Sequence, residues 1–173
     1  MEVLEQISQE KDFLVLIDLA SNSKTPADVL DRLSLHDCDE IRAAVGRNHS
    51  FKDLEKLADD LSPRVRAGVA QNLRANRDLM AKLANDNEET VREGVALNPM
   101  HIMSQFQHDP SKLVRLRFAQ NKNTPGVILA HLSDDMSALV RKAVYLHINT
   151  PPETKKKLLN EFQPSRAKDS EHS

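Results

Sequence analysis

Arginine and aspartate recur along this chain of 173 residues at a spacing that returns each type to an equivalent position. The arginines, 23 to 26 residues apart, are Arg42, Arg66, Arg92, Arg115 and Arg141. Four aspartates stand six residues before an arginine of this series: Asp60, Asp86, Asp109 and Asp135. A row of guanidinium groups could bind phosphates, or each group could bridge an aspartate of its own or a neighbouring repeat. We favour an ion-pair ladder, because the aspartates recur in step with the arginines.

Asparagine follows the same rhythm. It occurs six residues after each copy's arginine position, as Asn22, Asn48, Asn72, Asn98 and Asn121, and His147 takes its place in the last copy. An amide both donates and accepts hydrogen bonds, and Asn tolerates the left-handed conformation that ends many helices. We therefore expect these residues to end helices in that conformation and to bond turn backbone; ligand binding is the alternative.

Other chemistry is poorly represented. The sequence contains no Ser–His–Asp order, no glycine-rich phosphate loop and no His-Glu-x-x-His stretch. His101 and His108 could share a helix face, but no acidic residue follows at a zinc-ligand spacing. The single cysteine, Cys38, is flanked by Asp37, Asp39 and Glu40, a setting that disfavours a reactive thiolate. We expect no enzymatic activity, no metal and no cofactor.

The elements that position these residues are internal repeats. Six copies begin with an apolar anchor, with a second apolar residue four positions later; the anchors are Val15, Ile41, Val65, Val91, Val114 and Val140. This spacing predicts a helix in each copy. Upstream lies a second apolar pair at a spacing of three, as in Leu30 and Leu33. Each repeat of about 25 residues is therefore expected to hold two helices, of which the leucine helix is shorter or partly 3₁₀.

Turn residues mark where the helices should begin. Thr25, Thr124 and Thr150 each precede a proline, and we expect the threonine to be the N-cap and the proline the first helical residue. The predicted organisation is one solenoid over residues 1–163, with a capping helix at about 151–162. Residues 164–173 are polar and lack apolar periodicity, which predicts a disordered tail.

Stretches such as "LADDLSPRVRAGVAQN" and "LANDNEETVREGVALN" resemble leucine-rich repeat variant units, which are related in style to HEAT repeats. The resemblance covers roughly residues 15–150. It implies an all-α, right-handed solenoid of about six two-helix repeats, with alternating α and 3₁₀ layers. The prototype of that family holds an iron–sulfur centre on an N-terminal cysteine cluster. Cys38 stands alone here, so the resemblance does not extend to that cofactor.

The function should lie on a face of the second helices, because solenoids bind through equivalent positions of successive repeats. Nominally outward positions of the later copies are rich in leucine. The candidate partner-binding residues there are Leu97, Leu113, Leu116, Arg117, Leu139, Lys142, Tyr145 and Leu146. Either the curvature of the array buries these leucines, or they form a binding surface. If they do not bind, we expect the face of Arg47, Arg64 and Gln71 to do so.

Two classes of function remain. The first is a scaffold that binds another protein, and the second is a nucleic-acid-binding solenoid of the HEAT type. A net charge of −2, no Trp and one Tyr favour the scaffold, because nucleic-acid binding needs a basic face and usually aromatic groups that stack on bases. The sequence has no apolar run of the ~18 residues that a membrane span requires. We expect a monomeric, cytoplasmic protein.

Overall fold

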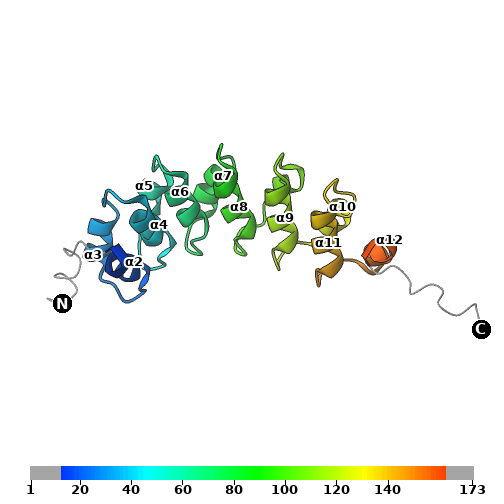
Figure 1. Ribbon diagram of the computed structural model, residues 1–173, viewed down its shortest axis with the longest axis horizontal. Helices are drawn as coiled ribbons and strands as arrows, with labels where there is room; N and C mark the ends of the chain where they lie inside the picture. The colour runs from blue at the N-terminus through cyan, green and yellow to red at the C-terminus, as the bar shows by residue number, and fades with distance from the viewer. Residues whose placement is uncertain (1–12, 163–173) are drawn as a thin grey trace, which may run out of the picture. The chain divides into compact units, whose positions relative to one another are not determined.

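The computed structural model describes residues 13–162, and every regular element in that range is a helix (Figure 1). The predicted all-α fold is confirmed. The described helices form two compact units that divide between His101 and Ile102. Residues 1–12 and the tail predicted at 164–173 lie outside the described range.

Unit 1 contains α2 (Phe13–Ser21), α3 (Ala27–Leu33), α4 (Asp39–Arg47), α5 (Leu54–Ala58), α6 (Pro63–Ala70), α7 (Arg77–Leu83) and α8 (Glu89–Leu97). Unit 2 contains η1 (Ser104–His108), α9 (Lys112–Gln120), α10 (Gly126–Leu132), α11 (Ala138–Leu146) and α12 (Pro152–Phe162).

Short and longer helices alternate, as the two-helix repeat predicts. The leucine helices α3, α5, α7, η1 and α10 have five to seven residues, and the second helices α4, α6, α8, α9 and α11 have eight or nine. The leucine helix is therefore the shorter one. Its predicted 3₁₀ geometry occurs only in η1 among the described repeats, and the other four are α-helical.

The sequence explains in part why η1 is a 3₁₀ helix while the other leucine helices are α-helical. In α3, α7 and α10 the last core leucine has a buried partner four residues earlier, as Val29 is to Leu33. A spacing of four is aligned by an α-helix and not by a 3₁₀ helix. In η1 the corresponding residue, Ile102, precedes the helix and is only half-buried.

In unit 1 the second helices α2, α4, α6 and α8 pack on one another in chain order, and α3, α5 and α7 pack against them (Figure 1). The core lies between these two layers. The anchors Ile41, Val65 and Val91 are at most 1% exposed, and leucine-helix residues such as Leu30 and Leu57 are equally buried. The apolar periodicity that predicted the helices is thus the periodicity of the core.

Glycine allows α4, α6 and α8 to approach closely. A Cβ on Gly68 would lie 2.5 Å from the carbonyl oxygen of Ala43 on α4, far inside van der Waals contact. A Cβ on Gly94 would lie 2.9 Å from the Cβ of Ala70 on α6. These positions therefore require the absence of a side chain.

In unit 2, α9 packs against η1 and α11, and α11 packs against α10 and α12. Phe106 and Phe118 meet edge to face in the core, with ring centroids 5.9 Å apart. Leu158 of α12 is buried, and Phe162 stacks at a tilt against Tyr145 of α11 at 5.7 Å. Helix α12 thus covers one side of α11. Within residues 13–162, no helix is long and apolar enough to cross a membrane.

Candidate interaction surface

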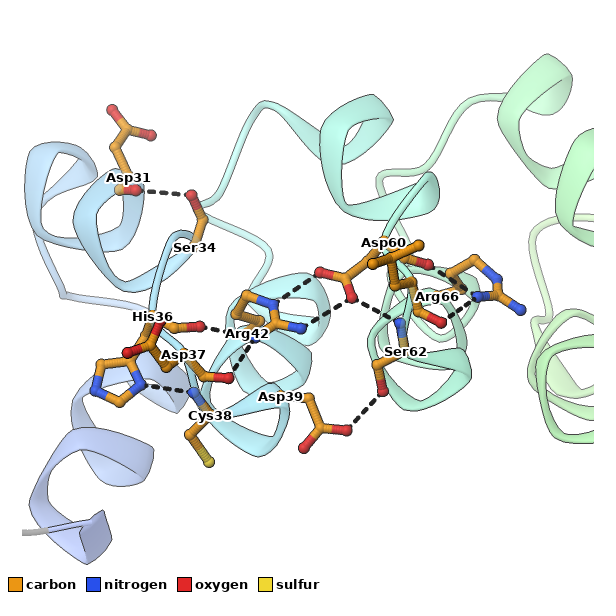
Figure 2. A network of polar contacts seen from close by, with 11 residues as sticks. Asp31, Ser34, His36, Asp37, Cys38, Asp39, Arg42, Asp60, Ser62 and Arg66 are labelled. Carbon is orange, nitrogen blue, oxygen red and sulfur yellow. Dashed lines mark hydrogen bonds and ion pairs between the residues drawn. The ribbon is translucent and has the colours of Figure 1, made fainter.

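The arginines of the series form ion pairs from one repeat to the next. The guanidinium of Arg42 donates to both carboxylate oxygens of Asp60, at 2.8 and 2.9 Å (Figure 2). Arg66 binds Asp86 in the same way at 2.7 and 2.9 Å. Both pairs are largely buried, with side chains 17% and 11% exposed. Each arginine thus takes the carboxylate of the following repeat rather than of its own.

The aspartate of the arginine's own repeat contributes a main-chain oxygen. Nη1 of Arg66 donates to the Asp60 carbonyl at 2.8 Å, as Figure 2 shows, and Nη1 of Arg92 donates to the Asp86 carbonyl at 2.8 Å. The Asp60 carboxylate also accepts the N–H of Ser62, the N-cap of α6, at 2.8 Å. Because one guanidinium holds the turns on both sides of its helix, it fixes the spacing of adjacent repeats.

Unit 2 has ion pairs of the same kind, and the last of them involves α12. Arg115 pairs with Asp135 and also bonds the carbonyl of Asp109, whose carboxylate accepts the Ser111 N–H. Arg141 pairs with Glu161, a residue that the sequence analysis missed. Its signal was present: Glu161 follows Arg141 by 20 residues, the same offset as Asp135 from Arg115.

These pairs keep the carboxylates charged. Hydrogen bonding from Arg42 lowers the pKa of Asp60, and Arg66 lowers that of Asp86 in the same manner, while burial acts in the opposite direction. The pKa of each arginine is raised in turn by its carboxylate. The guanidinium groups therefore face carboxylate and carbonyl oxygens, and this arrangement is an ion-pair ladder rather than an open row of cations.

Asparagine side chains form a second ladder. Nδ2 of Asn72 donates to the carbonyls of Gly46 and Asn48 in the preceding repeat, at 2.8 and 3.1 Å. Its Oδ1 accepts the N–H of Arg74 at 2.9 Å. Asn98 repeats the pattern, bonding the carbonyls of Ala70 and Asn72. Asn22 is exposed and its Oδ1 accepts the Lys24 N–H, while Asn121 is buried and accepts that of Asn123.

The left-handed conformation expected for these asparagines is wrong. Asn48, Asn98 and Asn121 have φ of −72°, −66° and −67°, with ψ near 120°. The extended backbone lets Oδ1 reach the N–H two residues later, which forms the turn without a positive φ. His147 performs the same two tasks, since Nε2 contacts the Asn121 carbonyl and Nδ1 accepts the Asn149 N–H, both at 3.0 Å.

The threonines expected to cap the leucine helices act differently. The hydroxyls of Thr25, Thr124 and Thr150 each donate 2.6 Å bonds to a carbonyl six residues earlier, at the end of the preceding helix. The N-caps of α3 and α10 are Pro26 and Pro125, without a side-chain cap. Threonine thus closes one helix rather than starting the next.

The leucines proposed for partner binding are partly exposed. Leu113, Leu139 and Leu146 are 37%, 57% and 68% exposed on the neighbouring helices α9 and α11, and Leu116 is half-buried. Ile148, which the sequence analysis missed, follows α11 and is 83% exposed. We call Leu113, Leu139, Leu146 and Ile148 the leucine surface. Leu146 and Ile148 also line a hollow of about 350 Å³, together with Ala119 and Ala143.

The polar candidates differ in exposure. Lys142 is exposed, Tyr145 is half-buried against Phe162, and Arg117 is half-buried with Nη1 3.4 Å from Gln120 Oε1. Leu97 is 41% exposed but belongs to unit 1. In α4, α6 and α8 the neighbouring second helix covers the position three residues after the anchor. The residues there, Ala44, Gly68 and Gly94, are buried.

His101 and His108, which the sequence suggested could share a helix face, have different neighbours in the structure. His101 bonds the Ala75 carbonyl at 2.9 Å, while the His108 ring meets that of His131 edge to face at 4.9 Å. Sγ of Cys38 lies 2.9 Å from Glu40, a contact between residues two apart in the chain.

Comparison with known proteins supports the repeat architecture. No family model matches the sequence, and no curated protein matches it either. One solved structure, described as a leucine-rich repeat variant with a novel repetitive protein structural motif, aligns at 26% identity with a TM-score of 0.64. The alignment covers 91% of this chain, which spans 64% of the length of that one. The predicted resemblance of this chain to the leucine-rich repeat variant fold is thereby confirmed.

Proposed function

We propose that this protein is a non-enzymatic scaffold that binds another protein through the leucine surface of α9 and α11. The observation that carries the proposal is the exposure of Leu139 and Leu146, at 57% and 68%, on one helix. They are seven residues apart and so lie on the same side of α11. Apolar side chains gathered at one place, rather than scattered, are typical of protein-binding surfaces.

Two other exposed leucines, both in unit 1, do not share a helix. Leu35 and Leu61 of unit 1 are 66% and 97% exposed, but they come from separate turns. Isolated apolar residues of this kind are ordinary on protein surfaces. In contrast, Leu113 and Leu139 occupy equivalent positions on packed helices, and the hollow beside Leu146 offers a recess for a partner's side chain.

The surroundings suit a protein partner better than a nucleic acid. Lys142 is an exposed cation near these leucines, while Arg115 and Arg141 are engaged by Asp135 and Glu161. An apolar centre with a charged rim is the usual composition of a protein interface, whereas a phosphate backbone requires several available cations.

The test is partner capture with matched variants. Immobilised full-length protein is compared with Leu146→Asp, Leu139→Asp and, as control, Leu61→Asp, whose side chain is 97% exposed in unit 1. Proteins captured from cells of the source organism are quantified by mass spectrometry. We expect a set that the wild type and Leu61→Asp retain and that both surface variants lose, with unchanged circular dichroism.

The proposal is wrong if Leu139→Asp and Leu146→Asp fold and capture the same proteins as the control. Sedimentation of the purified chain supplies a second measurement, because we propose a monomer. A dimer that Leu146→Asp dissociates would show that the leucine surface binds a second copy instead.

A further inference from the structure

A separate hollow lies on the second helices of unit 1. Its volume is about 470 Å³, and it is lined by side chains of α4, α6 and α8 and of the turn before α6. The polar lining residues are Asp39, Arg47, Ser62, Arg64, Gln71 and Thr90. None of the arginines and asparagines of the two ladders is among the residues that line it.

Arg47 is the unusual member of this set. Among residues 13–162, no carboxylate or carbonyl oxygen binds its guanidinium, whereas Arg42 and Arg66 are each bound to a carboxylate. The pKa of Arg47 is lowered, first by partial burial and then by the positive charge of Arg64. Arg47 is an exposed residue whose guanidinium faces the like charge of Arg64, and no anion is bound to it among the described residues.

Arg64 is only partly engaged. Its Nη1 binds Glu40, and this pair is well exposed, with side chains 55% and 40% accessible. Exposed pairs of this kind contribute little to stability, so Arg64 gains little from holding this geometry. An arginine has five N–H donors in a planar fork, and a second oxyanion can use those that Glu40 does not.

We propose that this hollow binds the carboxylate of an aspartate or glutamate side chain on an acidic protein segment. Arg47 would hold it directly through the fork of its guanidinium, and Arg64 would supply the second positive charge. The amide of Gln71 and the hydroxyl of Thr90 provide further donors around the same space. The proposal rests on the proposed function in that the ligand is a protein, but it does not require the leucine surface.

Charge decides between an acidic peptide and a nucleic acid. The hollow and its rim hold two arginines together with the carboxylates of Asp39 and Glu40. Asp39 accepts a 2.6 Å bond from the Ser62 hydroxyl (Figure 2), and both residues line the hollow, so the negative charge of Asp39 is part of the site. Because these four charges sum to zero, the site can hold one carboxylate beside Arg47 but lacks the net positive charge that a run of phosphates requires.

The test follows the arginine side-chain Nε–Hε signals of the ¹⁵N-labelled full chain by NMR. The probes are the blocked peptide Gly-Glu-Gly-Glu-Gly, its isostere Gly-Gln-Gly-Gln-Gly and a short single-stranded DNA. We expect the Glu peptide alone to shift the Arg47 and Arg64 signals. Arg47→Gln should weaken peptide binding about fivefold, the effect of one exposed charge pair, whereas Arg74→Gln should leave it unchanged.

A second measurement separates binding from structure. Arg47→Gln should unfold at the same denaturant concentration as the wild type or higher, because it removes an uncompensated cation, whereas Arg66→Gln should unfold earlier. The proposal is overturned if the Arg47 signal ignores the Glu peptide or responds equally to the Gln peptide. It is also overturned if DNA shifts the signal more than the Glu peptide. None of these outcomes bears on capture through the leucine surface.

Discussion

The guanidinium of Arg115 holds the carboxylate of Asp135 through two hydrogen bonds of 2.6 and 3.1 Å, across 20 residues of sequence. The same guanidinium bonds the carbonyl of Asp109 at 2.8 Å. The side chains of Arg115 and Asp135 are only 13% and 4% exposed. One arginine therefore joins two turns that belong to successive repeats, and its loss would leave a carboxylate partly buried without its partner.

The first prediction concerns the stability that the equivalent Arg66–Asp86 ion pair gives to unit 1. Arg66→Ala should lower the free energy of unfolding by about 3 kcal/mol, because Asp86 keeps its burial and loses its cation. Arg74→Ala, at an exposed position of the same unit, should change it by no more than about 0.5 kcal/mol. Urea denaturation followed by circular dichroism measures both. Equal midpoints for the two variants would contradict a structural role for the ladder.

The lowered pKa values of Asp60 and Asp86 give the second prediction. Below the ordinary value of 3.8 the unfolded chain takes up protons that the folded carboxylates still resist. The stability due to these pairs is therefore complete above that pH and is lost as pH falls through the lower, folded pKa. We expect the difference in unfolding free energy between wild type and Asp86→Asn to shrink as the pH falls from about 7 to about 2.

Removing the other partner is the control for that titration. Arg66→Gln should reproduce the flattened pH dependence of Asp86→Asn, because Arg66 is the main cause of the lowered pKa of Asp86. If the unfolding free energies of Asp86→Asn and wild type differ by the same amount at every pH, Asp86 contributes to stability by packing and not by its charge.

The asparagine ladder supplies the third prediction. Asn72→Ala leaves the buried carbonyls of Gly46 and Asn48 without the amide that binds them. We expect a loss of about 3 kcal/mol, since each unsatisfied buried group costs about 1–3 kcal/mol. Asn22 is the exposed member of the same series, so Asn22→Ala should lower the free energy of unfolding by less than about 1 kcal/mol. Thermal unfolding of the two variants checks this order, and equal losses would contradict it.

The close approach of α4 and α6 gives the fourth prediction. Gly68→Ala places a methyl group 2.5 Å from the main-chain oxygen of Ala43. Overpacking of about 1–3 kcal/mol or more should outweigh the ~1 kcal/mol that alanine gains in a helix, giving a net loss of about 2 kcal/mol. At Gly46 the nearest atom is 3.2 Å away, so Gly46→Ala should stay within about 1 kcal/mol of wild type. If Gly46→Ala unfolded at a lower denaturant concentration than Gly68→Ala, the steric explanation would be wrong.

The helices and their buried faces could be predicted because the spacing of four between Val65 and Val69, which places both on one side of an α-helix, recurs in every copy. The carboxylate that pairs with each arginine could not be predicted from the sequence. Asp60 lies six residues before Arg66 and 18 after Arg42, and sequence alone gives no preference between them. The stacking of the repeats decides, by turning the Asp60 carboxylate towards Arg42 and its carbonyl towards Arg66.

The candidate surface was harder to predict. The distance between second helices determines how far a side chain is covered, and that distance depends on close contacts such as the one at Gly68. An α-helical wheel treats Leu116 and Leu146 alike as outward, yet packing half-buries one and leaves the other 68% exposed. The sequence could not single out Arg47 as a binding residue. Its guanidinium differs from those of the ladder because it has no bound carboxylate among the described residues, and only the folded structure shows that.

The two ladders run in opposite directions along the chain. Arg42 reaches forward to the next repeat for a carboxylate, and Asn72 reaches back to the previous one for its carbonyls. Every junction of this type has the same chemistry on either side, so duplicating one whole repeat in frame would create a junction that already exists. Loss of a fragment within a repeat would break the register of both ladders at once. Such a gene can therefore change length by whole units, with each new length inheriting ready-made interfaces.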